Sequence, residues 1–141
     1  MQDFPAISPP APGVREPVVM VVDDSEADLL FTRIVLERSG NGWHVMPFES
    51  AREALVYLGQ PAVPPVNLIL LDINMPCMNG FEFLQAYSGL QAARTRASVV
   101  MLTSSPDPDD RSRALAFPCV RDYLLKPIDG ASVETLAHYL S

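Results

Sequence analysis

The stretch VVMVVDDSEADLLF, residues 18–31, decides the fold class of this chain. Its first five residues form a continuous apolar run, which is typical of a strand buried on both faces of a sheet. Ser25 followed by Asp28 makes a capping-box-like start to a helix. Apolar residues then recur at helical spacing, at Leu30, Phe31, Ile34 and Val35. The stretch therefore predicts a buried strand, an acidic turn and a helix.

The alternation of strand and helix continues along the rest of the chain. After the first strand at 18–22, strands are expected at residues 43–48, 66–71, 98–102 and 120–125. Helices are expected from Ser25 to the turn at 39–42, and at 50–58, 80 to about 88, 109–117 and 131–140. Parallel strands need helical crossovers, so five strand–helix units predict an α/β fold, a doubly wound parallel sheet with helices on both faces.

The composition is that of one acidic globular domain. The chain has 141 residues, of which 48% are hydrophobic and 19% charged, and its formal net charge is −7. This charge argues against a protein that binds nucleic-acid phosphates directly. The longest uncharged stretch, residues 54–71, is interrupted by prolines and a glycine, so no membrane helix is expected.

The N-terminal segment and the cysteines suggest domain bounds and a location. Five of the fourteen prolines fall in residues 1–17, which predicts an extended, disordered arm before a folded domain at 18–141. No secretory signal is visible, and Cys77 and Cys119 do not make a disulfide framework. We therefore expect a cytoplasmic protein.

Polar residues of complementary chemistry follow the expected strands. Asp23 and Asp24 follow the first strand, Asp72 the third, residues 103–105 (Thr-Ser-Ser) the fourth and Lys126 the fifth. Ligands bind outside the carboxyl ends of parallel strands, so these side chains are expected on one rim of the sheet. Singly, each has another explanation, because Asp24 could cap the next helix and the others could be ordinary loop residues.

Together, these residues predict a magnesium-dependent phosphoryl-transfer site. Neighbouring carboxylates repel one another unless a cation neutralises them, and hard oxygen ligands suit Mg²⁺. Lys126 is the only lysine beside nine arginines, which favours a site that needs a compact point charge. Pro127 follows it, so the Lys126–Pro127 peptide bond is a candidate for the cis form.

Four blocks of this sequence resemble a known family. They are VVDDSEADLLF at 21–31, LILLDINMPCMNGFEFL at 68–84, VVMLTSS at 99–105 and DYLLKP at 122–127. In this order, over residues 18 to about 140, they resemble the receiver domain of bacterial two-component response regulators. The resemblance implies a flavodoxin-like fold with strand order 2-1-3-4-5 and five flanking helices.

The resemblance also implies a role for the matching residues of the acidic rim. Asp72 resembles the phospho-accepting aspartate, and Lys126 the catalytic lysine that pairs with the phosphoryl group. Asp23 and Asp24 resemble the acidic pair that organises Mg²⁺, with Asp24 as a direct ligand and Asp23 acting mostly through water. Asp72 and the backbone carbonyl of Asn74 would complete the metal site.

A second set of matching residues resembles a switch. Thr103 resembles the switch hydroxyl, Ser104 the small residue after it, and Tyr123 the switch aromatic. Thr103 would donate to the phosphoryl group and leave space into which Tyr123 rotates, although Tyr123 could instead be a strand tyrosine with an ordinarily buried ring. Pro76 and Gly80 match loop residues that shape the turn after the acceptor.

The expected function is that of a single-domain response regulator. No output domain follows the last expected helix, so the chain is expected to act through protein partners. These are a histidine kinase or phosphotransfer protein and a downstream protein. A homodimer is expected through the fourth helix, fifth strand and fifth helix. It is not expected to be a turnover enzyme. The turn Phe117-Pro118-Cys119 departs from the family pattern, which often has glycine there.

Two alternatives remain open at this point. A haloacid-dehalogenase-type phosphohydrolase also uses an aspartate after a parallel strand, but it needs a second acid where this chain has Asn74, and a cap insertion for which there is little room. An unphosphorylated receiver-like scaffold is the second alternative.

Overall fold

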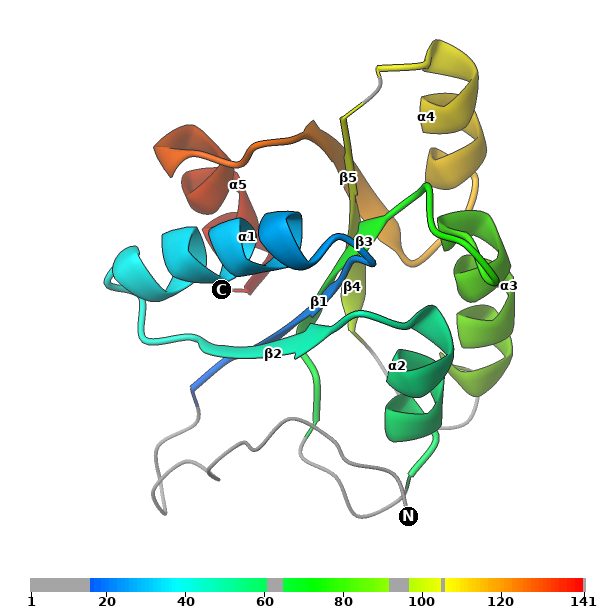
Figure 1. Cartoon of the computed structure of the whole chain (residues 1–141), viewed down its shortest axis with the longest axis horizontal. Helices are drawn as coiled ribbons and strands as arrows, with labels where there is room; N and C mark the ends of the chain where they lie inside the picture. The colour runs from blue at the N-terminus through cyan, green and yellow to red at the C-terminus, as the bar shows by residue number, and fades with distance from the viewer. Residues whose placement is uncertain (1–15, 61–64, 92–96, 105, 141) are drawn as a thin grey trace.

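A computed structural model describes residues 16–60, 65–91, 97–104 and 106–140. Its five strands form one parallel sheet in the order β2-β1-β3-β4-β5 (Figure 1). This confirms the fold class and the strand order. The elements are β1 (Val18–Val22), α1 (Glu26–Arg38), β2 (His44–Phe48), α2 (Ala51–Leu58), β3 (Leu68–Asp72), α3 (Gly80–Gln91), β4 (Ser98–Thr103), α4 (Pro108–Leu115), β5 (Val120–Leu125) and α5 (Gly130–Leu140).

The sheet separates two apolar cores. Alternate side chains of a strand point to opposite faces, so Met20 and Val22 belong to one core and Val19 and Val21 to the other. Helices α2, α3 and α4 cover the first core, and α1 and α5 cover the second (Figure 1). All five residues of β1 are buried, as expected for a central parallel strand.

The position of β2 at an edge of the sheet agrees with its sequence. Pro47 lies within this strand and pairs with Val21 of β1. Proline has no N–H to donate to a second neighbouring strand, so it is tolerated at an edge. The other edge strand is β5, which is only partly buried.

Several element boundaries differ from those expected. β3 is two residues later at its start than expected and includes Asp72, which pairs with Leu102. β4 likewise includes Thr103, which pairs with Leu125. Both polar residues are therefore the last residues of their strands and are held in the ladder, not in the loops that follow.

Helix α4 ends at Leu115, two residues before the expected end at Phe117. The N–H of Phe117 donates to the Ala114 carbonyl at 3.1 Å, which closes a tight turn. A residue before proline avoids the helical conformation, and Pro118 follows Phe117. Pro118 thus ends the helix earlier than its own position.

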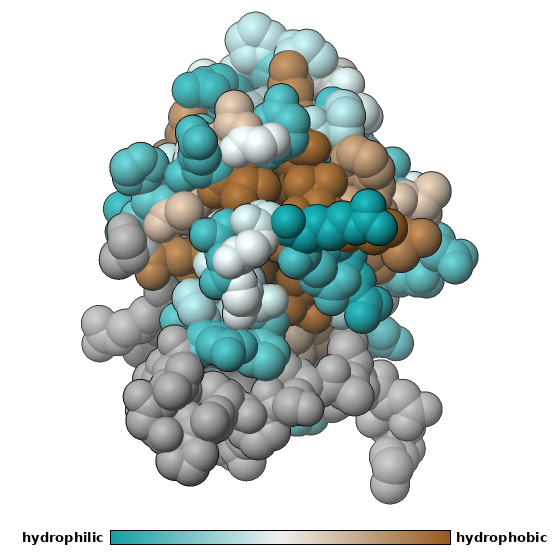
Figure 2. Space-filling view, turned by 90° about the vertical axis from the view of Figure 1, so that its left-hand side faces the viewer, coloured by the Kyte–Doolittle hydropathy of each residue, from teal (hydrophilic) through white to brown (hydrophobic). Residues whose placement is uncertain are grey.

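The buried face of α1 differs from the face that its apolar spacing predicts. Leu30 and Phe31 are 55% and 48% exposed, and Ile34 is also exposed. Leu29, Thr32 and Leu36 are the buried residues of this helix. Figure 2, viewed from the left-hand side of Figure 1, where α1 and α5 lie, shows apolar side chains reaching the surface between polar ones.

The expected N-terminal arm lies almost entirely outside the described residues, which begin at Glu16. The first strand begins at Val18, where the folded domain was expected to start. Within the described residues, none of the helices combines the length and the apolarity that crossing a membrane requires.

Candidate functional site

The carboxyl ends of the parallel strands bring the expected polar residues together. Asp72 and Thr103 end β3 and β4, while Asp23 and Lys126 directly follow β1 and β5. The backbone continues the sheet here, because the Lys126 N–H donates to the Thr103 carbonyl at 2.8 Å and the Asp23 N–H to the Phe48 carbonyl at 3.0 Å. The rim is therefore built on ordered backbone.

Lys126 is the centre of the site. Its ammonium Nζ lies 2.6 Å from Asp23 Oδ2, 3.1 Å from Asp28 Oδ2 and 3.3 Å from Asp72 Oδ1. Its side chain is only 11% exposed. The Lys126–Pro127 peptide bond is cis, the form for which it was a candidate. The one ammonium of Lys126, directly after β5, thus contacts three carboxylates: Asp23 after β1, Asp72 at the end of β3 and Asp28 in α1.

The surroundings shift the pKa of both charged partners. Burial raises the pKa of Asp72 to about 6, the charges of Asp23 and Asp24 add to this rise, and Lys126 opposes it. Burial lowers the pKa of the Lys126 ammonium, but the hydrogen bonds and charges of its carboxylate partners outweigh burial and raise it above its usual value. The lysine therefore stays charged, while Asp72 is a carboxylate destabilised by burial and by like charge.

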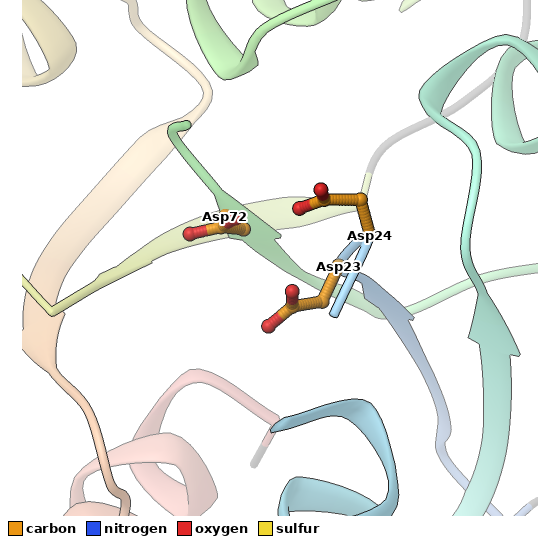
Figure 3. A group of neighbouring side chains, drawn as sticks. All are labelled: Asp23, Asp24 and Asp72. Atoms are coloured by element: carbon orange, nitrogen blue, oxygen red, sulfur yellow. The ribbon is translucent and has the colours of Figure 1, made fainter. Parts of the chain in front are cut away.

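Three carboxylates of the rim are close enough to share one cation. Ligand oxygens of Asp23, Asp24 and Asp72 all lie within 4.8 Å of one another, and Figure 3 shows them grouped at the ends of β1 and β3. Asp23 is buried and already engages the Ser25 N–H through Oδ1 and Lys126 through Oδ2, whereas Asp24 is exposed. A cluster of three carboxylates is a donor set that fits Mg²⁺.

The loop after Asp72 is held close to the end of β3 by Gly80. The Gly80 N–H donates to the Ile73 carbonyl at 2.8 Å. A Cβ on Gly80 would lie 2.8 Å from the Asp72 carbonyl oxygen, so only glycine fits at this approach. Asn74 is exposed in this loop, and the role of its carbonyl as a metal ligand stays a prediction.

Thr103 and Tyr123 lie next to each other on β4 and β5. Both are buried, and a hydrogen bond joins the Thr103 side chain to the Tyr123 phenol. Burial and then the charge of Asp110 raise the pKa of Tyr123, while this hydrogen bond lowers it. The tyrosine ring already lies inward in this structure. Ser104, the next residue after Thr103, is exposed.

The contact of Asp28 with Lys126 was not predicted from the sequence. The sequence predicts a capping box that includes Asp28, and half of that box exists, because the Asp28 N–H donates to Ser25 Oγ at 3.3 Å. The other half is absent, since the Ser25 N–H donates to Asp23 Oδ1. The separation of 98 residues along the chain left no local signal for the contact with Lys126.

A cavity of about 230 Å³ opens beside the ammonium of Lys126, between α1 and the loops that follow β4 and β5. The cavity is lined by Asp28, Phe31, Thr32, Ser104, Lys126 and Pro127.

Comparison with known proteins identifies the family. The model of the response regulator receiver domain matches residues 19–138. The chain belongs to this receiver domain family. Receiver domains are signalling phospho-acceptors that interact with histidine kinases or phosphotransfer proteins. The match gives no support to the haloacid-dehalogenase alternative.

Relatives of this receiver domain differ in how much of their length it spans. Two-component response regulator ORR13 of Oryza sativa subsp. japonica is 32% identical over 127 residues, which cover 90% of this chain and 100% of that protein. ORR1 of the same plant is 28% identical over 123 residues, and the chain spans about half (52%) of its length.

Solved structures share the receiver fold. A response regulator receiver protein from Dyadobacter fermentans DSM 18053 is 36% identical with a TM-score of 0.76, covering 87% of this chain and 97% of that one. A two component response regulator from Cytophaga hutchinsonii has a TM-score of 0.81 at 25% identity, covering 89% and 98%.

Proposed function

We propose that this receiver domain accepts a phosphoryl group on Asp72 from a histidine kinase or phosphotransfer protein, in a reaction that depends on Mg²⁺. The observation that carries the proposal is the contact of one buried lysine, Lys126, with the carboxylates at the ends of β1 and β3. A phosphoryl group needs an in-line nucleophile and positive charge on its equatorial oxygens, and these residues can provide both.

In the proposed step, an oxygen of Asp72 attacks phosphorus and forms a new O–P bond. The bond from phosphorus to the donor breaks, and its electron pair leaves with the donor. Lys126, 3.3 Å from Asp72 Oδ1, is placed to pair with the incoming oxygens. The cavity on the α1 side lies beside Lys126 and leaves space next to this lysine.

Mg²⁺ would be held by Asp24 and Asp72, by Asp23 through water, and by the carbonyl of Asn74. When bound, the ion supplies positive charge to the transferring oxygens. The ion would also reduce the repulsion among the three carboxylates, whose oxygens lie within 4.8 Å of one another. Among the described residues, Lys126 is their only cation partner.

The output would be a change at a protein surface. The phosphoryl group adds a charge of about −1.5 to −2 and new acceptor oxygens to the end of β3. Thr103 could donate to one of these oxygens and so give up its present contact with Tyr123. We propose that this alters the face formed by α4, β5 and α5, through which a downstream protein or a second copy would bind. We also propose that the protein acts as a single-domain regulator in the cytoplasm and does not turn over external substrates.

Incubation with acetyl phosphate tests the class of reaction. With Mg²⁺, the protein should gain one phosphoryl group per chain and then stop, and EDTA should prevent the gain. Repeated hydrolysis of small phosphate esters would instead indicate a phosphohydrolase. No gain under any condition would indicate an unphosphorylated scaffold.

The proposed metal site has its own test. Mg²⁺ should raise the melting temperature of the wild type, because the site exists only in the folded state. Asp24→Ala should lose this shift and Asp23→Ala should weaken it. Glu26→Ala removes an exposed acid of α1 that is not one of the three clustered aspartates, so this variant should keep the shift. Equal shifts in all four proteins would place the metal elsewhere.

A further inference from the structure

The ammonium of Lys126 has three N–H donors, and three carboxylates already surround it. Asp28 Oδ2, at 3.1 Å, lies closer to Nζ than Asp72 Oδ1 does, at 3.3 Å. Lys126, which should pair with the phosphoryl group, therefore also pairs with Asp28. This carboxylate is not one of the three at the proposed metal site.

The backbone leaves the Asp28 carboxylate available for this contact. In a complete capping box, the acid three residues into the helix accepts from the backbone N–H of the capping residue. Here the Ser25 N–H donates to Asp23 Oδ1 at 2.9 Å. Asp28 therefore loses its local partner to Asp23, and its side chain reaches Lys126 instead.

We propose that Asp28 is a positioning residue that competes with the phosphoryl group for Lys126 and so slows phosphorylation of Asp72. The inference rests on the proposed function of the site. Asp28 belongs to the first turn of α1, and its negative charge partly neutralises the charge of Lys126.

The contact of Lys126 with Asp23 explains why Asp28 restrains the lysine without being needed to hold it. Asp23 is buried and lies 2.6 Å from Nζ, so it fixes the ammonium by itself. The Asp28 side chain is 49% exposed and comes from the solvent side. Removal of its charge should leave Lys126 in place and free one donor for the phosphoryl oxygens.

The cavity beside Lys126 strengthens this inference. Asp28 lines the cavity together with Lys126 and Ser104, so its carboxylate lies beside an open space next to the lysine. A phosphoryl donor such as acetyl phosphate is an anion, and a carboxylate beside Lys126 repels it. Both effects, the competition for Lys126 and the repulsion, act in the same direction.

The test compares the rate of phosphorylation by acetyl phosphate in Mg²⁺ for three variants. Asp28→Asn should react roughly fivefold faster than the wild type, the scale of one partly exposed charge contact. Asp28→Glu keeps the charge and should react at close to the wild-type rate. Glu26→Gln is the matched control, because it removes the same charge from the same exposed helical turn, and it should change the rate much less.

A second measurement detects the contact between Asp28 and Lys126 in the absence of metal and phosphate. The Lys126 ammonium signal in NMR spectra of the metal-free protein should shift in Asp28→Asn, return towards the wild-type position in Asp28→Glu, and stay unchanged in Glu26→Gln. A change in helix stability alone would not produce this order.

The outcomes separate this inference from the proposed function. A phosphorylated wild type with an equal or slower rate in Asp28→Asn overturns the competition and leaves the acceptor role of Asp72 intact. An equal gain in Asp28→Asn and Glu26→Gln also overturns it, since charge in the helical turn would then be the cause. A wild type that takes up no phosphoryl group overturns the proposed function and this inference together.

Discussion

At the scale of single residues, Asp72 combines a carboxylate with a buried, acidic environment. Its pKa of about 6 lies above the usual 3.8, because burial and the neighbouring aspartates outweigh Lys126. Between these two pH values the folded protein binds more protons than the unfolded chain, so the contribution of Asp72 to stability falls as the pH rises from about 4 to 6.

Asp72→Asn should therefore stabilise the metal-free protein at neutral pH. We expect the free energy of unfolding at pH 7 to rise by about 1–2 kcal/mol. The gain should shrink as the pH falls through 6 and vanish below about pH 4, where Asp72 is protonated in both states. Urea unfolding in EDTA across this range measures it.

Asp129→Asn is the control for this stability change. Hydrogen bonds from the backbone and the side chain of Ser132 lower the pKa of Asp129, so its charge is favoured in the folded protein. This exposed substitution should give no gain at pH 7. A gain in Asp72→Asn that persisted at pH 4 would mean that the charge of Asp72 is not its cause.

Lys126→Arg should disable the site although it conserves the charge. The Lys126 side chain is 11% exposed, and oxygens of three carboxylates lie within 3.3 Å of its ammonium. A planar guanidinium is larger and cannot occupy the same point. We expect slow residual phosphorylation, and loss of the chemical-shift changes at Thr103 and Tyr123 that beryllofluoride should cause in the wild type. A wild-type spectral response in the variant would contradict this role for Lys126.

At the scale of elements, the approach of α3 to the end of β3 positions the acceptor. Gly80→Ala would bring a Cβ within 2.8 Å of the Asp72 carbonyl and 3.0 Å of the Ile73 Cα, both of them backbone atoms. We expect a loss of about 1–3 kcal/mol in the free energy of unfolding, as in other overpacked sites. Chemical denaturation measures this loss.

Gly89→Ala is a matched control in the same helix. Its Cβ would meet nothing within 4 Å, so alanine should stabilise α3 by about 0.5–1 kcal/mol. Equal effects of the two substitutions would show that the close approach at Gly80 is unimportant.

The elements also show what the sequence could and could not predict. The buried runs and the polar residues after them were enough to predict a parallel sheet and the rim at its carboxyl ends. The inward face of α1 was not predictable from spacing alone, because its buried set includes a polar residue, Thr32, while Leu30 and Phe31 are exposed.

The other features that the sequence did not predict depend on contacts between residues far apart in the chain. Asp28 has a sufficient local explanation as part of a helix cap, and its partner Lys126 lies 98 residues away. Asp72 and Thr103 were expected to follow their strands, whereas pairing with the next strand makes them the last strand residues. Such assignments depend on which strands are neighbours, and a single segment does not contain that information.

At the scale of the whole molecule, the proposed output connects the acceptor to the α4–β5–α5 face. Only a difference in affinity between the two states can transmit the signal, and a change from 1:99 to 99:1 needs about 5.5 kcal/mol. One phosphoryl group acting through Thr103 and Tyr123 should supply part of this, so we expect a graded shift in association.

Thr103→Ala should break this connection without preventing phosphorylation. Thr103 is buried at the end of β4 and hydrogen-bonded to Tyr123, so its loss should uncouple the tyrosine from Asp72. Sedimentation with and without beryllofluoride should show a state-dependent change for the wild type and a smaller change for the variant. If neither Thr103→Ala nor Tyr123→Ala alters any state-dependent contact, the output face lies elsewhere, and the Phe117-Pro118-Cys119 turn is the next place to examine.

The acceptor role of Asp72 is tested by the intact masses of the wild type and of Asp72→Asn after reaction with acetyl phosphate and Mg²⁺. Both proteins should be folded, since the substitution is expected to stabilise the domain. We expect one added phosphoryl group in the wild type and none in Asp72→Asn. Addition of a phosphoryl group to Asp72→Asn at the wild-type rate would contradict the acceptor role.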